Sequence, residues 1–478
     1  MEPGTSGSVD DYTEIIQRLP VYLKFAYGMG HVLNDICASM WFTYLLVFFH
    51  LVLGFDPTLA GVVLFIGQVA DAVVTPFVGL HSDKNDNFWL CRYGRRKTWH
   101  LLGTICVILG FPFIFSQCIG CKDAHQWAQL VYYAAFVIIF QFGWAAVQIS
   151  HLALVPDLTP AEHERTELIA IRFTFTVFSN VLVYCIMWGI LHITNDTQYE
   201  SQIGPGDVYK FQKVVLIGIA TGVLASIIFH VVVKERVNDN ANDNLLHGNG
   251  GRTASALLKD VKLYQVAWVY MLTRLFINLC QIYMPLYLHA SLNMPATSLA
   301  YIPLIMYLSS FFMSLIIERL NTKWGRKIAY SIGASFALCA CIWIRFGNDD
   351  MYIKYEIYAV AVLLGSAGAI MLVTSLGVTA DLIGKNTESG AFAYGIMSFA
   401  DKLSNGVVIM LIQYFVRHFP SDCANYYYKN ILTYVCGISV IFGLLMVLYI
   451  KPFPRDVVFN VLRNEEDEGF IETANDNE

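Results

Sequence analysis

The sequence has few charged residues. Asp, Glu, Lys and Arg together make up 14% of its 478 residues, whereas hydrophobic residues make up 56%. Soluble globular proteins carry about 25% charged residues, so this composition excludes an ordinary soluble domain. The apolar residues form long runs, and about 20 of them are needed to cross the hydrocarbon core of a bilayer as a helix. The sequence therefore predicts a polytopic membrane protein.

The sequence also lacks the motifs of an enzyme or of an ATP-driven pump. Gly365 and Gly368 are not followed by the Gly-Lys-Ser/Thr ending of a nucleotide-binding loop. Glu162, His163 and Glu164 are adjacent rather than spaced along a helix as zinc ligands would be. We therefore expect no enzymatic activity, no cofactor, no metal site and no nucleic-acid partner. The energy source is then an ion gradient or the gradient of the substrate itself.

No cleavable signal peptide is evident at the N-terminus. The first 20 residues are polar and acidic and contain no apolar core, so we expect this segment to lie in the cytoplasm. The 11 cysteines are scattered, and most fall within apolar segments, where a thiol is usually a small core residue. Cys118 and Cys121 lie in a loop and are candidates for a disulfide, with Cys423 as a third candidate.

Two sets of six apolar segments make up most of the chain. The first set lies at about 21–50, 57–82, 98–117, 126–156, 167–193 and 211–233, and the second at about 263–291, 297–320, 327–346, 353–382, 389–418 and 429–451. A stretch rich in Asn, Gly and charge separates them and is typical of a flexible linker. The predicted units are an N-terminal segment at 1–20, a six-helix bundle at 21–233, a linker at 234–262, a second bundle at 263–451 and an acidic tail at 452–478.

The basic residues are concentrated in three of the loops. Lys and Arg gather after segments 2, 6 and 8, whereas the loops after segments 1 and 7 have none. Short basic loops stay on the cytoplasmic side of a membrane, which predicts that both termini are cytoplasmic. Asn195 begins an Asn-Asp-Thr sequon in a loop on the opposite side, where glycosylation can occur.

The two halves of the sequence resemble each other. Tyr93-Gly94-Arg95-Arg96 after segment 2 is repeated as Trp324-Gly325-Arg326-Lys327 after segment 8, and Asp157 after segment 4 is matched by Asp381 after segment 10. A parallel repeat of six spans is typical of the major facilitator fold. We therefore predict an all-α membrane protein of that fold, with about twelve transmembrane helices in two bundles. Conformational latches are predicted at Asp83, Arg95, Arg96, Asp157, Arg326 and Asp381; the alternative is that these charges only set the topology.

Several predicted spans carry ionisable residues. Asp35, Asp71, Arg172 and Lys402 would each be costly in lipid, which makes them candidates for a site that faces the interior of the bundle. For neutral polar residues such as His31, Gln141 and Asn180, hydrogen bonding between helices is the stronger interpretation. Further candidates on the spans are Gln148, Arg274, Asn278, Gln281, Tyr283, Asp401 and Asn405.

At these positions the sequence resembles the glycoside–pentoside–hexuronide:cation symporters, a branch of the major facilitator superfamily. The matching pieces are 28–35, 71–76, 144–156, Arg172-Phe173 and Lys402-Leu403. The resemblance implies that Asp35 and Arg172 contact the substrate, that Asp71 is a cation-site acid, and that Lys402 is a site lysine. Thr75 and Gln148 stand where those carriers show further acids, so a sodium site lacks two of its hard oxygen ligands.

A closer resemblance, to an animal branch of the same superfamily, covers nearly the whole chain. It includes HVLNDICASMWFTYLL, IFQFGWAAVQISHLALVPDL and SGAFAYGIMSFADKLSNG. The resemblance implies a carrier of lysosomes and melanosomes that moves cysteine into the organelle and influences pigmentation. Leu245-Leu246 in the linker, with Asp239 and Asp243 upstream, is suggestive of a sorting signal.

A cysteine substrate is compatible with the charged candidates. A zwitterion needs an acid for its ammonium group, here Asp35 or Asp71, and a base for its carboxylate, here Arg172 or Lys402. We expect Trp41, Tyr283 and Tyr394 to shape a pocket for the small thiol. Carboxylates in a low-dielectric cavity have raised proton affinity, which makes Asp71 and Asp35 candidates for proton coupling.

Three hypotheses follow from the sequence. The first is a cysteine carrier, with proton-linked transport as one option. The second is a cation-coupled sugar or glycoside symporter that keeps the same acids. The third is a membrane protein that transports nothing and interacts with lipids. The fold does not require an oligomer, so we expect a monomer in the bilayer.

Overall fold

The computed structural model describes residues 19–82, 93–159, 162–193, 202–235, 261–383, 387–416 and 424–450. Every secondary-structure element within these ranges is helical, and twelve helical stretches are long and apolar enough to cross a membrane. The predicted fold class is confirmed. The predicted unit boundaries at 20, 233, 262 and 451 stay predictions, since several fall at or beyond the edges of the described ranges.

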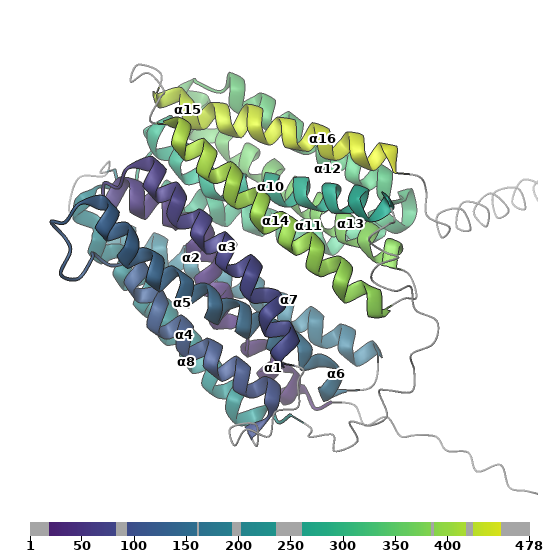
Figure 1. Cartoon of the computed structure of the whole chain (residues 1–478). Coiled ribbons are helices and arrows are strands. Elements are labelled where there is room, and N and C mark those ends of the chain that lie inside the picture. Colours follow the sequence, from purple (N-terminus) through teal and green to yellow (C-terminus); the bar gives the residue numbers. More distant parts are fainter. Residues whose placement is uncertain are drawn as a thin grey trace, which may run out of the picture.

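The first half of the chain forms the lower group of helices in Figure 1, coloured purple to teal. Its first span is interrupted: α1 ends at Met29, Gly30 and His31 form a turn, and α2 begins at Val32. The sequence predicts one continuous segment there. The helices are α1 (Val21–Met29), α2 (Val32–Val47), η1 (Phe48–Val52), α3 (Pro57–Ser82), α4 (Arg95–Ile114), α5 (Gln126–Ala153), α6 (Val155–Leu158), α7 (Glu162–Ile193), η3 (Pro205–Asp207) and α8 (Val208–Val232).

The second half forms the upper, green and yellow group, and α14 crosses beside α3 of the first half (Figure 1). The halves also meet where α11 packs on α7 and α10 packs on α2. The helices are α10 (Val261–Ala290), α11 (Ser298–Trp324), α12 (Arg326–Phe346), η5 (Tyr352–Glu356), α13 (Ile357–Ile383), α14 (Thr387–Val416), α15 (Ala424–Asn430), η7 (Ile431–Val435) and α16 (Cys436–Tyr449).

Two ends of the molecule can be distinguished by the chain segments they carry. We call the linker face the end where the described chain leaves at Glu235 after α8 and returns at Val261 in α10. We call the opposite end the disulfide face, because Cys118 and Cys121 are bonded to each other there. Cys423 lies outside the described residues. The predicted topology assigns the linker face to the cytoplasm.

The repeat seen in the sequence has a counterpart in the backbone. Gly94 precedes α4 with a φ of 118°, and Gly325 precedes α12 with a φ of 79°. Such positive φ values are readily adopted only by glycine, so each half uses the glycine of its Gly-Arg motif to start the third span.

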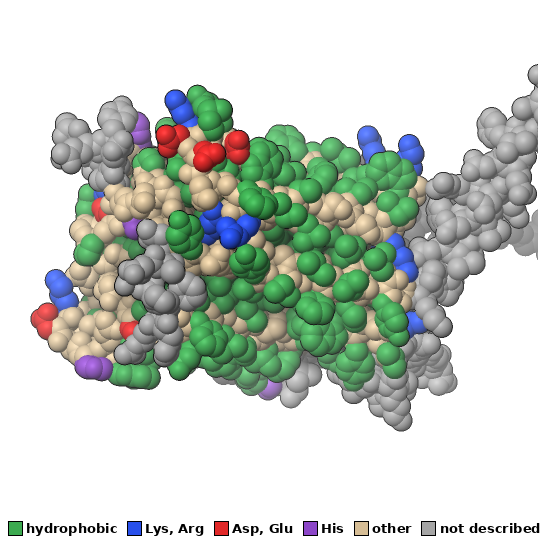
Figure 2. Space-filling model, turned by 90° about the horizontal axis from the view of Figure 1, so that it is seen from above, with side chains coloured by type: hydrophobic (Ala, Val, Ile, Leu, Met, Phe, Trp, Pro, Cys, Tyr) green, Lys and Arg blue, Asp and Glu red, His purple; other side chains and the backbone are tan. Residues whose placement is uncertain are grey.

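The outer surface of the helices is apolar. Hydrophobic side chains cover much of the face shown in Figure 2, and large ones such as Leu224, Phe312 and Leu445 are more than half exposed. In water this surface would be strongly unfavourable, whereas lipid tails solvate it. The surface therefore agrees with a chain that crosses a bilayer many times.

Two glycines bring α4 and α5 into backbone contact. A Cβ atom added to Gly143 would lie 2.6 Å from the carbonyl oxygen of Gly103, and one added to Gly103 would lie 2.7 Å from that of Gly143. Membrane helices pack closely through small residues of this kind. The sequence places both residues in spans but does not show that they face each other.

We expect Gly143→Ala to destabilise the first half by about 1–3 kcal/mol, because α4 and α5 would have to move apart. The measurement is thermal unfolding of the purified protein in detergent. Gly189→Ala is the matched control, since a Cβ there meets nothing within 4 Å. Equal unfolding temperatures for the two variants would contradict the prediction.

Candidate functional site

A cavity of about 520 Å³ lies between the two halves of the molecule. It is lined by α2, α5 and α7 from the first half and by α10, α11 and α13 from the second. Most of its wall is apolar, and a small number of charged and amide groups face it: His31, Asp35, Gln148, Arg172, Asn180, Arg274, Asn278 and Gln281. An apolar cavity with few polar groups is the usual form of a small-molecule site.

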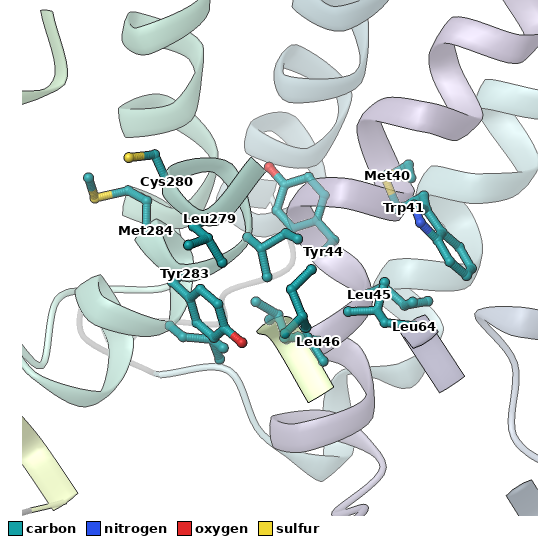
Figure 3. Packing of buried hydrophobic residues seen from close by; sticks show 14 of the residues in the cluster. Met40, Trp41, Tyr44, Leu45, Leu46, Leu64, Leu279, Cys280, Tyr283 and Met284 are labelled. Carbon is teal, nitrogen blue, oxygen red and sulfur yellow. The ribbon is translucent and has the colours of Figure 1, made fainter. Parts of the chain in front are cut away.

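The cavity is sealed on the disulfide side by contacts between the halves. The Tyr44 hydroxyl donates to the carbonyl oxygen of Leu299 over 3.1 Å. Figure 3 shows Tyr44 and Leu46 of α2 close to Leu279 and Tyr283 of α10, which belong to one buried apolar cluster. The cavity instead extends toward the linker face, where its wall includes residues from the early turns of α7 and the late turns of α11, among them Ile169, Phe173 and Ser314.

The wall of the first half carries a chain of charged and polar groups. Nδ1 of His31 lies 3.0 Å from Oδ1 of Asp35, and Nη2 of Arg172 donates to Nε2 of His31 over 3.0 Å. The Thr176 hydroxyl donates to Oδ2 of Asp35 over 2.8 Å. His31 therefore separates the acid from the base, so that Asp35 and Arg172 can each meet an opposite charge of a ligand.

The second half contributes an ion pair. Nε of Arg274 lies 3.2 Å from Oδ2 of Asp401, and Nδ2 of Asn405 donates to Oδ1 of the same carboxylate over 2.6 Å. Arg274 lines the cavity, whereas Asp401 is 4% exposed and lies behind it. Asn405 thus contacts Asp401 and is not among the residues that line the cavity, and its predicted part in substrate binding stays a prediction.

A second ion pair joins the halves directly. Nζ of Lys402 on α14 donates to Oδ1 of Asp71 on α3 over 2.6 Å and to the hydroxyl of Thr75 over 2.8 Å. Asp71 is 4% exposed. The ammonium group also lies 5.8 Å from the ring centroid of Trp144, which faces the cavity. Any event that neutralises Asp71 would therefore act on a contact between the two halves.

The carboxylates and the Arg and Lys side chains of this region balance in charge. Asp35, Asp71 and Asp401 supply three negative charges, and Arg172, Arg274 and Lys402 supply three positive charges. Burying a charge is costly unless it is paired. A ligand without net charge, including a zwitterion, can bind here and leave this balance unchanged.

The structure separates the predicted site residues into three groups. Asp35, Gln148, Arg172 and Gln281 line the cavity, and Asp71 and Lys402 form the pair beside it. Trp41 and Tyr283, predicted to shape the pocket, lie in the apolar core: Trp41 packs on Phe140, and Tyr283 stacks on Tyr428. Neither residue is among those that line the cavity. The side chain of Tyr394 lies outside the described residues.

Three hydroxyl residues that the sequence did not single out form what we call the floor of the cavity: Tyr184 and Tyr307 line it, and Thr43 is buried behind them. The Gln281 amide donates to the hydroxyls of Thr43 and Tyr307 over 3.1 and 3.4 Å, and Thr43 also bonds Tyr184. Hydroxyl residues are common in spans, so their type alone carries no signal. For Thr176, which bonds Asp35 on the wall of the first half, the sequence offered one indication: it follows Arg172 by one helical turn.

Gln281→Leu is expected to raise the substrate KM about tenfold with a smaller change in the maximal rate. The substitution removes the bridge from α10 to Thr43 of α2, and a neutral hydrogen bond contributes roughly 0.5–1.5 kcal/mol. The measurement is the concentration dependence of uptake. Gln129→Leu is the control, because it removes amide hydrogen bonds from α5 to the carbonyl oxygens of Lys122 and Ala124, and Gln129 does not line the cavity. An unchanged KM in Gln281→Leu would rule out this role for the floor.

Four of the six predicted latch residues form two ion pairs, one within each half. Arg96 binds Asp157 in the first half, and Arg326 binds Asp381 in the second. Each pair joins the start of a span to a neighbouring helix of its own half, so neither connects the two halves in this conformation. Asp83 lies outside the described residues, as do the predicted glycosylation site Asn195 and the Leu245-Leu246 motif. The latch role of Arg95, Arg96, Asp157, Arg326 and Asp381 stays a prediction.

Comparison with known proteins relates the chain to a large group of carriers. Residues 26–455 match the family model described as MFS/sugar transport protein. Major facilitator superfamily domain-containing protein 12 of Homo sapiens is 42% identical over 444 residues, which are 88% of this chain and 92% of that protein. The Mus musculus protein of the same name is 41% identical over 445 residues, 89% of this chain and 92% of that protein. The crystal structure of a D-xylose–proton symporter has a TM-score of 0.66 at 14% identity and covers 90% of this chain and 98% of that one.

Proposed function

The chain belongs to the MFS/sugar transport protein family of membrane carriers, and on this premise we propose that it transports cysteine across a membrane by alternating access. A carrier of this kind needs a central site that faces one side at a time. The cavity between the halves, sealed toward the disulfide face and directed to the linker face, has that form.

The main support for the proposal is the arrangement of Asp35 and Arg172 on the two sides of His31. The carboxylate can receive the ammonium group of an amino acid, and the guanidinium, with Arg274 across the cavity, can receive its carboxylate. Charge-assisted hydrogen bonds are roughly twice as strong as neutral ones. The choice of cysteine among small zwitterions is supported by the resemblance to animal lysosomal and melanosomal carriers.

The proposed location and direction follow from the same resemblance and from the basic loops. With both termini in the cytosol, the linker face lies on the cytosolic side, and the cavity receives cysteine there and delivers it into the lumen of lysosomes and melanosomes. The lipid bilayer and a single copy of the chain suffice for this cycle.

Proton linkage is proposed at the pair of Asp71 and Lys402. Protonation of Asp71 removes its negative charge and weakens the 2.6 Å contact that joins α3 to α14. A proton on this acid thereby changes the balance between the two orientations of the halves. Asp35, which faces the cavity, is the second candidate for protonation.

The experiment is cysteine uptake into vesicles that contain the purified protein, with the lumen set first acidic and then neutral. We expect saturable entry that unlabelled cysteine competes and that melibiose does not. A dependence of the initial rate on luminal pH that is lost in Asp71→Asn supports proton linkage, provided that each rate is divided by the amount of folded protein, since this variant is expected in low yield. Vesicles that take up a glycoside but not cysteine would refute the amino-acid assignment.

A sugar or glycoside symporter is the second candidate. It is favoured by the description of the matching family and by the ring of Trp144 on the cavity wall, since sugars often pack on aromatic rings. In the same vesicles this candidate predicts that melibiose competes for uptake. Asp35→Asn should abolish uptake here as well, so only the competition separates the two candidates. If folded protein moves neither compound, the hypothesis of a lipid-interacting protein without transport activity is the one to pursue.

A further inference from the structure

Four histidines gather in the first half near the linker face. Successive ring centroids are 5.5 Å apart for His31 and His151, 5.9 Å for His151 and His100, and 4.9 Å for His100 and His230. They come from the α1–α2 turn, α5, α4 and α8. The first three are 4% exposed or less. Apart from His31, none of them has a part in the proposed substrate site.

Two of these histidines hold the break between α1 and α2. Nε2 of His151 donates to the carbonyl oxygen of Tyr27 over 2.8 Å, and Nε2 of His100 donates to that of Gly30 over 2.9 Å. A helix that stops leaves such carbonyl groups without helical partners. Residue 30 must be glycine here, because a Cβ would lie 2.6 Å from the ring of Phe229 and 2.8 Å from that of His151.

The hydrogen-bond directions in this cluster follow from the carbonyl of Gly30. Because a carbonyl can only accept, Nε2 of His100 carries a hydrogen, and in the neutral ring Nδ1 is then an acceptor. Nδ1 of His100 lies 3.1 Å from Nε2 of His230, which must donate. Nδ1 of neutral His230 is therefore an acceptor, and the Tyr93 hydroxyl, 2.9 Å away, donates to it.

The same cluster can accept one additional proton without losing a hydrogen bond. The Tyr93 oxygen also lies 3.1 Å from the carbonyl oxygen of His230. If Nδ1 of His230 is protonated, the hydroxyl can turn to donate to that carbonyl and can accept from Nδ1. A proton on Nδ1 of His100 would instead face the hydrogen on Nε2 of His230. The geometry therefore provides for one proton, on His230.

We propose that His230 is a proton-binding site that is reached from the linker face through Tyr93 and that acts through His100 on the α1–α2 turn. Tyr93 is 41% exposed, which gives the site access to the medium on that side. This site is separate from Asp71, and it senses the pH of the compartment at the linker face whatever the transported substrate is.

Burial and the surrounding charges together determine when the proton binds, and burial disfavours the charged ring. Nζ of Lys97 donates to the carbonyl oxygen of His230 over 3.0 Å, and its positive charge opposes a second one nearby. The carboxylate of Glu235 accepts from the backbone N–H of Arg96 and Lys97 and partly offsets that charge. The titratable or charged groups around the cluster are Tyr93, Lys97 and His100, Tyr27 on α1, Asp35 on α2, His31 between them, His151 on α5, Arg172 on α7, and Lys234 and Glu235 after α8.

Proton binding at His230 is expected to favour the conformation described here. The bonds from His230 to His100 and to Tyr93 become charge-assisted and stronger, so α4 and α8 hold the α1–α2 turn more firmly. The α2 helix carries Asp35 in the cavity wall and Tyr44 in the seal on the disulfide side. A fixed turn therefore keeps the cavity directed to the linker face and slows the return to the other orientation.

The test measures how fast a membrane-impermeant maleimide labels Ser314→Cys from the linker side, after subtraction of the labelling of the parent protein. Ser314 lies on the cavity wall. We expect the labelling rate, divided by that of the same protein with His230→Gln, to rise about threefold as the pH falls from about 7 to about 4, because burial and the nearby Lys97 ammonium oppose the charged ring. Dividing the two labelling rates removes the effect of pH on the ionisation of the introduced thiol, because both proteins carry that thiol.

Tyr93→Phe provides a second variant, since it removes one exposed hydroxyl and keeps every histidine. It is expected to abolish the same rise. His81→Gln is the control, because this histidine lies at the linker-side end of α3 and bonds only the Phe77 carbonyl among the interactions described for it. A ratio that does not change with pH, or a rise that His81→Gln abolishes as well, would overturn the proposal.

Discussion

Asp35→Asn is expected to lower the initial rate of cysteine uptake by about 100-fold or more. The substitution keeps the size of the side chain but removes the charge that meets the substrate ammonium group. Removing one partner of a buried charge pair costs about 3–5 kcal/mol, and each 1.4 kcal/mol corresponds to a factor of ten. The measurement is radiolabelled cysteine uptake into vesicles with equal amounts of folded protein.

Thr176→Val is the matched control for this prediction. It removes the 2.8 Å hydrogen bond to the Asp35 carboxylate and leaves both charges in place. We expect uptake to fall only about three- to tenfold, in line with roughly 0.5–1.5 kcal/mol for one hydrogen bond. If Asp35→Asn retains more than half of the wild-type rate, or if Thr176→Val has the larger effect, Asp35 does not bind the substrate ammonium.

The second large effect is expected at the pair of Asp71 and Lys402. Asp71→Asn alone leaves the Lys402 ammonium nearly buried and without its counter-charge, and Lys402→Met alone does the same to the carboxylate. Each single variant should lose about 3–5 kcal/mol of stability and should be recovered in low yield. The double variant should regain the yield, because neither charge is left unpaired.

The transport assay then separates stability from function. The double variant should fold and show no cysteine uptake above that of empty vesicles, because the ionisable contact between α3 and α14 is gone. Size-exclusion profiles and thermal unfolding report folding, and uptake reports transport. A double variant that transports at the wild-type rate would show that the pair is structural and that the proton acts elsewhere.

Much of the fold could be predicted because a membrane span is a local property of the sequence. About 20 apolar residues must follow one another for a helix to cross the hydrocarbon core, and the predicted segments agree with the twelve helices within the described residues. The repeated Gly-Arg motif likewise pointed to two similar halves. The break at Gly30 was missed, because glycine and histidine also occur within continuous spans and only the packing of His100, His151 and Phe229 around it explains the turn.

Of the site, mainly the charged residues could be predicted from the sequence. Asp35, Arg172, Asp71 and Lys402 could be singled out because lipid does not tolerate their charges. Trp41 and Tyr283 could not be placed in the same way, since an aromatic side chain is equally stable in an apolar core and on a cavity wall. Tyr283 is fully buried, and Trp41 fills the space beside Gly67.

The sequence by itself determined that the chain crosses a membrane, roughly where each span lies, and which charged residues need a partner there. Only the tertiary structure decided which residues pair with these charges. Lys402 and Asp71 are 331 residues apart and meet at 2.6 Å, and Tyr93 reaches His230 across 137 residues. The physical reason is that hydropathy acts residue by residue along the chain, whereas a pair of charges or imidazoles depends on which faces of distant helices are packed together.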